Sequence, residues 1–134
     1  MDLLEYQGKT LFERHGLPVP AGKHALSADQ AVAAADEIGY PVAVKAQVLI
    51  GGRGKAGGIK IATDAGEAAA HAEAILGMEI TGPHGEGPFT VGELWIEEGS
   101  EIESEYYASV ILDRAEKKLL VMLSARGGMD VEAI

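Results

Sequence analysis

Apolar residues recur at the spacing of one helical face in three parts of the chain, residues 3–15, 28–38 and 65–76. Ser27 and Asp64 immediately precede the second and third parts. Each can act as an N-cap, because its short polar side chain accepts a hydrogen bond from a free backbone N–H of the first turn. A glycine follows each part, which is a common helix stop. The pattern therefore predicts three helices.

Between these helices the pattern changes to β-branched runs and to alternation of polar and apolar residues, which predict strands. Five segments have this character: 41–48, 58–62, 93–97, 106–113 and 118–124. Residues 17–20 are predicted to be extended and to form a further strand, and residues 81–88 are predicted to be a surface loop. Short links favour antiparallel pairing, with a hairpin turn at 113–117. The predicted fold class is α+β, or mixed α/β, with antiparallel strands and packed helices.

Composition and charge narrow the classes of function. Lys and Arg number 11 and Asp and Glu 21, so the formal net charge is −10, which argues against binding to nucleic acid or to an anionic membrane. The absence of cysteine excludes disulfides and cysteine-ligated zinc. No apolar run approaches the roughly 20 residues of a membrane span. We expect a soluble, cytoplasmic protein of one domain, or one lobe of a larger domain.

Glycine accounts for 18 residues, and five of them lie between residues 51 and 58. This segment, called the glycine loop below, joins two predicted strands and carries Arg53 and Lys55. Glycines let the backbone approach a ligand closely, and successive N–H groups can form a concavity that binds anions. The loop is neither a Walker A loop nor a dinucleotide-binding turn, because a strand follows it. The pattern favours phosphate binding over a flexible hairpin with incidental cations.

Lys45 lies on the strand that enters the glycine loop. A charge in an apolar strand is unfavourable unless it meets an anion or water, so Lys45 is a candidate phosphate ligand. The alternative is a lysine that protects an edge strand from aggregation. Glu97 and Ser100 follow another strand, and Glu105 belongs to an alternating row of carboxylates. By themselves these positions are more typical of a solvated surface than of a base or sugar site.

The chain contains no recognisable catalytic or metal-binding constellation. Its four histidines are scattered along the sequence, at His15, His24, His71 and His84. They show neither the spacing of metal ligands nor the pairing of a catalytic triad. We therefore assign them structural or surface roles, and we assign no catalytic residue and no metal ligand to this chain.

Several motifs together resemble the succinate–CoA ligase β-subunit family. They are the opening MDLLEYQGK, residues 16–20, residues 44–48 leading into the glycine loop, and the pairs or triplets at 96–97, 105–107 and 113–114. The resemblance covers essentially the whole chain, and residues 51–58 are its most specific part. It implies an ATP-grasp fold, in which two α+β lobes clamp a nucleotide between them.

The resemblance implies roles for the cationic residues that agree with their pattern. Lys45 would contact the nucleotide phosphates, and Gly52, Arg53 and Gly54 would form the loop over them. Cationic groups and Mg²⁺ offset the charge that develops on a transferred phosphoryl group. We therefore expect Lys45 and Arg53 to act by positioning and electrostatic stabilisation, and not by proton transfer.

The resemblance also implies where the rest of the nucleotide and its metal ion would bind. Glu97 and Ser100 would lie at the hinge beside the adenine, and Glu105 would meet the ribose. The nucleotide would be ATP or GTP, and the sequence leaves this choice open. The Mg²⁺ ligands of the family would lie beyond Ile134.

The family's β subunit is much longer than 134 residues. We expect residues 1–134 to form the N-terminal part of an incomplete ATP-grasp domain, a view that the abrupt apolar ending at 131–134 supports. The implied partner is an α subunit that carries the phosphohistidine and the CoA site, so none of the histidines here would be phosphorylated. The fragment alone is expected to be inactive.

The reaction implied for the complete enzyme couples phosphoryl transfer from ATP, or GTP, to the formation of succinyl-CoA in the citric acid cycle, or runs in the reverse direction. Two alternatives remain open. One is a related malate– or citrate–CoA ligase subunit, because the determinants of the acid lie mostly outside this chain. The other is a free-standing nucleotide-binding module without catalysis.

Overall fold

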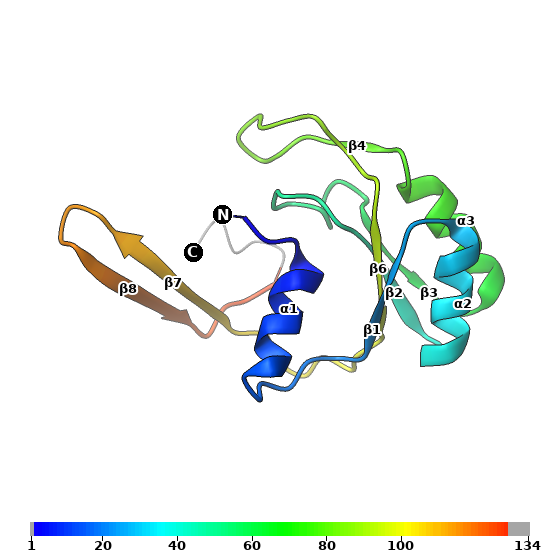
Figure 1. Ribbon diagram of the computed structural model, residues 1–134, viewed down its shortest axis with the longest axis horizontal. Coiled ribbons are helices and arrows are strands. Elements are labelled where there is room, and N and C mark those ends of the chain that lie inside the picture. The colour runs from blue at the N-terminus through cyan, green and yellow to red at the C-terminus, as the bar shows by residue number, and fades with distance from the viewer. Residues whose placement is uncertain (1, 129–134) are drawn as a thin grey trace. The chain divides into compact units, whose positions relative to one another are not determined.

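The computed structural model describes residues 2–128, which divide into two units at Ser100 and Glu101 (Figure 1). The expectation of an incomplete domain drew on residues 131–134, which lie outside the described residues. The first unit contains α1 (Glu5–Arg14), β1 (Gly22–Ala25), α2 (Ala28–Ile38), β2 (Val42–Ala46), β3 (Ile59–Ala62), α3 (Ala65–Ile75), β4 (Glu79–Ile80), β5 (Phe89–Thr90) and β6 (Leu94–Glu98). The second contains β7 (Tyr107–Asp113) and β8 (Lys118–Ser124).

Four strands of the first unit form an antiparallel sheet in the order β1-β6-β2-β3. The predicted pairing of β2 with β3 is confirmed, with Val44 opposite Lys60. The strand after α1 begins at Gly22, so the prediction of a strand within residues 17–20 is wrong. The two prolines of that segment lack the N–H that a ladder needs. β6 is the last of these four strands in the sequence, but it lies between β1 and β2 in the sheet. This position follows only from tertiary packing.

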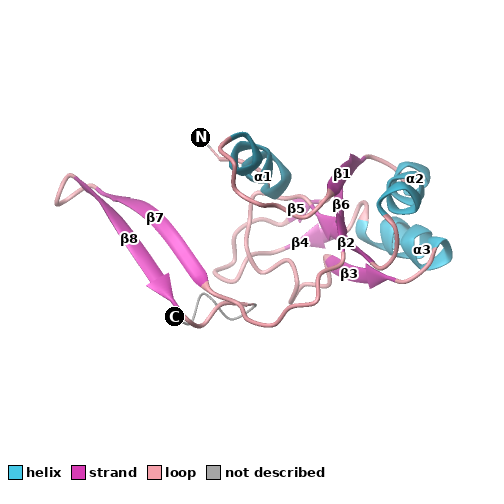
Figure 2. Ribbon diagram, turned by 90° about the horizontal axis from the view of Figure 1, so that it is seen from below, coloured by secondary structure: helices cyan, strands magenta, loops and turns pink. Residues whose placement is uncertain are grey.

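The helices cover opposite faces of this sheet. α2 and α3 pack on one face, and α1 lies across the other (Figures 1 and 2). Small side chains let α2 and α3 approach the sheet and each other closely, since five of their alanines are buried: Ala31, Ala34, Ala35, Ala68 and Ala72. α1 has no fully buried residue. Its inward side chains therefore meet the sheet as a polar layer.

Both predicted helix caps are confirmed. The Ser27 hydroxyl accepts a hydrogen bond of 3.1 Å from the amide of Gln30, and the Asp64 carboxylate accepts one of 2.8 Å from the amide of Glu67. Residues 81–88 form a loop as predicted, but the two-residue strands β4 and β5 pair on either side of it. No helix in residues 2–128 is long and apolar enough to cross a lipid bilayer.

The second unit is built on the predicted hairpin. β7 and β8 pair antiparallel from Tyr107 opposite Ser124 to Asp113 opposite Lys118. The Asp113 carboxylate accepts a hydrogen bond of 3.0 Å from the amide of Glu116 and so stabilises the turn. The prediction of two strands joined at 113–117 is confirmed.

Candidate functional site

Lys45 and Glu97 lie on the sheet face that α1 covers. Lys45 of β2 is opposite Trp95 of β6, and Ala43 is opposite Glu97, so the two charged residues are diagonal neighbours on one face. The Lys45 Nζ lies 2.6 Å from Oε2 of Glu97. β2 lies between β6 and β3, so Lys45 is not on an edge strand and the protective alternative is wrong. Glu97 is buried, so it does not belong to a solvated turn.

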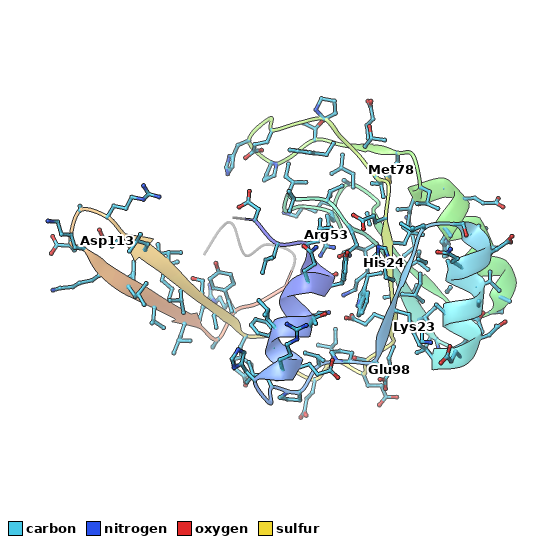
Figure 3. All side chains as sticks on the ribbon, in the orientation of Figure 1. Lys23, His24, Arg53, Met78, Glu98 and Asp113 are labelled. Atoms are coloured by element: carbon cyan, nitrogen blue, oxygen red, sulfur yellow. The ribbon has the colours of Figure 1, made fainter. Side chains whose placement is uncertain are left out.

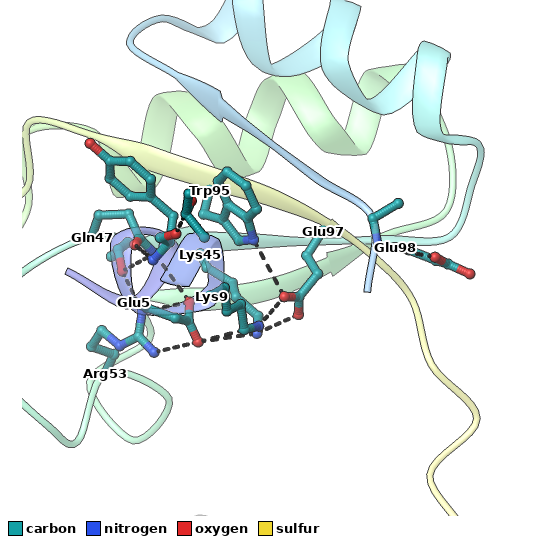
Figure 4. Close-up of polar contacts among 12 residues, drawn as sticks. Glu5, Lys9, Lys45, Gln47, Arg53, Trp95, Glu97 and Glu98 are labelled. Carbon is teal, nitrogen blue, oxygen red and sulfur yellow. Dashed lines mark hydrogen bonds and ion pairs between the residues drawn. The ribbon is translucent and has the colours of Figure 1, made fainter. Parts of the chain in front are cut away.

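α1 adds a second carboxylate and a second lysine to this pair. Glu5 and Lys9 are one helical turn apart and both face the sheet (Figure 4). The Glu5 carboxylate lies 3.4 Å from Lys45 and 3.8 Å from Lys9. Lys9 also bonds to Glu97. Two lysines and two glutamates therefore form a closed ring between α1 and the sheet.

Arg53 joins this ring from the glycine loop. Its side chain points back toward α1 and the end of β2 (Figure 3). Nη1 donates to Oε1 of Glu5 at 3.2 Å and to the carbonyl of Ala46 at 2.8 Å, while Nη2 donates to Oε2 of Glu5 at 3.0 Å. We call Glu5, Lys9, Lys45, Arg53 and Glu97 the charged cluster. It contains three cations and two carboxylates, in a chain whose formal net charge is −10.

Both carboxylates of the charged cluster are held in the ionised form. Burial by itself raises the pKa of Glu5, but the hydrogen bonds and charge of Arg53 outweigh it. With the two neighbouring lysines they lower the pKa from 4.5 to about 2. Burial likewise raises the pKa of Glu97, and its bonds to Lys45 and Lys9 outweigh that effect and lower it. At neutral pH the cluster is therefore fully charged and internally paired.

The glycine loop is closed by its own backbone. The amide of Gly58 donates to the carbonyl of Arg53 at 2.8 Å, and the carbonyl of Gly58 accepts from Ala46 at 2.7 Å. Two more amides, of Ala56 and Gly57, donate within the loop. These bonds hold the loop in one conformation, which disagrees with a flexible hairpin. They also mean that the amides of residues 56–58 are already engaged, so an anion would have to meet the earlier part of the loop.

Packing also restricts the glycine loop. A β-carbon on Gly58 would lie 2.9 Å from Cδ1 of Ile80 and 3.2 Å from the carbonyl oxygen of Arg53, so a side chain cannot be added there without displacing the loop. Gly52 has a φ of 76°, which favours glycine. A hollow of about 560 Å³ adjoins the loop, lined by Asp2, Leu3, Glu5, Val48, Leu49, Ile50, Gly51 and Arg53. One end of the charged cluster therefore opens to this hollow.

Aromatic residues flank the other end of the charged cluster. Trp95 stacks on Tyr6 with ring centroids 5.6 Å apart, and its Nε1 donates to Glu97 at 3.3 Å. The indole covers Gly22, where a β-carbon would lie only 2.2 Å from the ring. A second hollow, of about 510 Å³, lies beside the indole and is lined by Lys9, Thr10, Glu13, Val19, Pro20, Ala21, Gly22, Trp95 and Glu98. The cluster thus lies between two hollows on one face of the sheet.

The structure brings together part of the predicted site. Lys45, Arg53 and Glu97 are in the charged cluster, and Gly52 and Gly54 lie in the loop that carries Arg53. Ser100 and Glu105, the other two predicted residues, are not among the residues that contact the charged cluster in the description above. Ser100 is exposed at the end of the first unit, and Glu105 belongs to the second unit, where its carbonyl accepts from Gly127.

Sequence reasoning did not identify three residues of this site. Glu5 and Lys9 were noted only as parts of a motif, and Gln47, which donates to Glu5 at 3.2 Å, only as part of a strand. The spacing of Glu5 and Lys9 places them on one face of a helix, and this is the signal that could have found them. That spacing does not show which residues of the sheet Glu5 and Lys9 contact.

Comparison with known families agrees with this architecture. Residues 2–134 match the family described as ATP-grasp domain, and the chain belongs to this family. It is 48% identical over 134 residues to the protein named succinate–CoA ligase [ADP-forming] subunit beta of Halorubrum lacusprofundi. It is 47% identical over 139 residues to the protein of the same name of Bordetella petrii. The two alignments include the whole of this chain but only 34% and 35% of the lengths of these relatives.

Solved structures show the same fold. A dinucleotide-forming acetyl-coenzyme A synthetase 1 from Ca. Korarchaeum cryptofilum superposes with a TM-score of 0.75 at 22% identity, over 92% of this chain and 53% of that one. A Pyrococcus horikoshii protein gives a TM-score of 0.74 at 25% identity, over 98% and 55% of the two chains. The predicted ATP-grasp fold and the predicted α+β fold class are therefore confirmed.

Proposed function

We propose that this chain supplies the nucleotide-binding lobe of the β subunit of an ADP-forming succinate–CoA ligase. In the complete enzyme, phosphoryl transfer from ATP, or GTP, would drive the formation of succinyl-CoA, or run in reverse. The observation that carries the proposal is the convergence of Lys45 and Arg53 on Glu5, where Arg53 belongs to a closed glycine loop and lines an open hollow. The naming of the relatives, which are about three times as long, supports the choice of reaction.

Within this lobe, the cationic residues would bind and orient the phosphates. Lys45 and Arg53 would stabilise charge on the transferred group electrostatically, and they would not transfer protons. Gly52 and Gly54 would let the loop backbone approach the phosphates. Glu97 would lie at the hinge beside the adenine.

Two predicted residues would contact the base and the sugar of the nucleotide. Ser100 would border the base, and Glu105 would accept hydrogen bonds from the ribose hydroxyls. Both side chains belong to exposed residues, as such contacts require.

Mg²⁺ would accompany the nucleotide, as it does in ATP-grasp domains generally. The donor set of the charged cluster does not suit it, because Glu5 and Glu97 are already engaged by three cations. In residues 2–128 there is no group of three or more His, Asp or Glu residues that could hold a metal ion. We therefore propose that the Mg²⁺ ligands lie beyond Ile134, where the ion would offset charge on the phosphates.

The proposal includes an α subunit as partner, which would carry the phosphohistidine and the CoA site, and a cytoplasmic location. Succinate and CoA would be substrates of the assembled enzyme. A malate– or citrate–CoA ligase subunit would share the nucleotide lobe and differ in residues outside this chain. Assays with succinate, malate and citrate on the assembled enzyme separate these activities.

The test of nucleotide binding is a calorimetric titration of the full-length protein with Mg-ATP. We expect binding that is lost, or weakened on the order of 100-fold, in Lys45→Ala. Lys60→Ala is the matched control, because Lys60 is exposed on the neighbouring strand and faces the other side of the sheet. Absence of binding by the unaltered protein, or equal binding by Lys45→Ala, would contradict the proposal.

A further inference from the structure

Glu5 contacts all three cations of the charged cluster. Its carboxylate takes two hydrogen bonds from Arg53, at 3.0 and 3.2 Å, and lies 3.4 Å from Lys45 and 3.8 Å from Lys9. Gln47 adds a fourth donor at 3.2 Å. Glu5 is therefore the residue through which α1, β2 and the glycine loop are joined (Figure 4).

The contacts of Arg53 show what Glu5 controls. A guanidinium has five N–H donors, of which Nη1 carries two. Both of these are used, one by the carbonyl of Ala46 and one by Glu5, and Nη2 gives one more to Glu5. The guanidinium is thus fixed in position and orientation by a carboxylate on one side and by the end of β2 on the other.

This fixed side chain is linked directly to the conformation of the glycine loop. The backbone carbonyl of Arg53 accepts the hydrogen bond of the Gly58 amide that closes the loop. A movement of Arg53 would therefore disturb both the position of its charge and the closure of the loop. Glu5 holds the loop through Arg53, although it lies 48 residues away in the sequence.

Repulsion among the three cations explains why the carboxylate of Glu5 is needed. Lys9, Lys45 and Arg53 repel one another, and the repulsion is strong because they are only partly exposed to solvent. Among the contacts described above, Glu97 bonds to the two lysines and not to Arg53. Without Glu5, Arg53 would keep only the carbonyl of Ala46 and would gain by turning toward water.

We propose that Glu5 is a positioning residue of the nucleotide site, which holds Arg53 in the arrangement that binds the phosphates beside Lys45. Glu5 itself is an anion and does not contact the phosphates. This inference rests on the proposed function and adds to it a residue of α1 that acts only through others. Both cations remain when Glu5 is changed and only their positions are loosened, so the loss of Glu5 should appear in the KM for the nucleotide more than in kcat.

The test uses Glu5→Gln in the full-length enzyme, assembled with its partner subunit. Gln keeps the size of the side chain but removes the charge and one of the two acceptors for Arg53. We expect the KM for ATP to rise at least about tenfold while kcat falls less than about threefold. Glu73→Gln is the matched control, because Glu73 is exposed on α3, and it should leave both constants unchanged.

A double-mutant cycle with Arg53→Met separates positioning from a general structural role. If Glu5 acts mainly through Arg53, adding Glu5→Gln to Arg53→Met should change the KM for ATP less than about twofold. Additive effects of the two substitutions would overturn the inference. An unchanged KM in Glu5→Gln would overturn it as well.

A second variant covers the case in which Glu5→Gln does not fold, as judged by circular dichroism. Glu5→Asp keeps the charge but withdraws it by one methylene, so it should raise the KM for ATP by a smaller factor, and an unchanged KM overturns the inference. The proposed function is tested separately by the unaltered enzyme. If the unaltered enzyme does not use ATP, both the proposed function and the role of Glu5 are contradicted. If it uses ATP and the Glu5 variants have the same KM, only the role of Glu5 is contradicted.

Discussion

Lys45 and Glu97 form an ion pair of 2.6 Å although they are not opposite each other in the sheet. The side chains of both residues are largely withdrawn from water, with 16% and 8% of their surface exposed. A buried pair of this kind stabilises the fold only if further partners satisfy its remaining donors and acceptors. Lys9 and Trp95 do this for Glu97, and Glu5 does it for Lys45. The pair is therefore part of the charged cluster and not an isolated salt bridge.

Replacing Lys45 by Met should lower kcat/KM for ATP by on the order of 100-fold, because a fixed positive charge beside the phosphates is removed. The fold should survive, since Lys9 still neutralises Glu97. Steady-state kinetics of the assembled enzyme measure the first effect, and circular dichroism the second. Lys60→Met should behave as the unaltered enzyme does; a loss of equal size in that variant would show that the effect is not specific to the site.

Substituting Gly22 by Val should destabilise the first unit by about 1–3 kcal/mol, because the new side chain would overlap the indole of Trp95. Urea denaturation monitored by tryptophan fluorescence suits this measurement, since Trp95 is the only tryptophan. Gly8→Ala is the control. Gly8 lies inside α1 with open space around it, so this variant should be neutral or gain up to about 1 kcal/mol. Equal stability of the two variants would contradict the predicted overlap.

Stability should fall as the pH is lowered through the range in which Glu5 takes up a proton. Its pKa is about 2 in the folded protein and 4.5 ordinarily. Its stabilising contribution is therefore complete above about 4.5 and is lost between that pH and about 2, by about 3 kcal/mol in all. Urea denaturation at several pH values should give a shallower decline for Glu5→Gln. A residual decline is expected from Glu97, whose pKa is also lowered, and identical slopes would refute the prediction.

Removing the cap of α3 should have a smaller, local effect. Asp64→Ala deletes the acceptor for the Glu67 amide and should cost about 1 kcal/mol in the free energy of unfolding. Nucleotide affinity should not change, because α3 packs on the sheet face away from the charged cluster. Glu73→Ala, an exposed change on the same helix, provides the comparison, and a similar loss in it would argue against a capping role.

Local patterns predicted most of the secondary structure. The caps at Ser27 and Asp64 and the turn at 113–117 depend on neighbours within a few residues, and all three are confirmed. The strand expected within residues 17–20 lies instead at Gly22–Ala25. Its position is set by pairing with β6, more than 60 residues later, and by the close approach of Trp95 to Gly22. Neither partner is visible in the local pattern.

The sequence by itself determined the helices, the hairpins and the candidacy of Lys45 and Arg53, because glycine spacing, caps and a charge in an apolar strand are local properties. Glu97 became a candidate only through the family resemblance of the motifs. Only the tertiary structure decided that β6 lies between β1 and β2, which brings Glu97 beside Lys45. It also decided that α1 places Glu5 against Arg53. These contacts join residues from four separate segments of the chain. The pairing of each carboxylate with its cations depends on distances, and only the packing of these segments sets those distances.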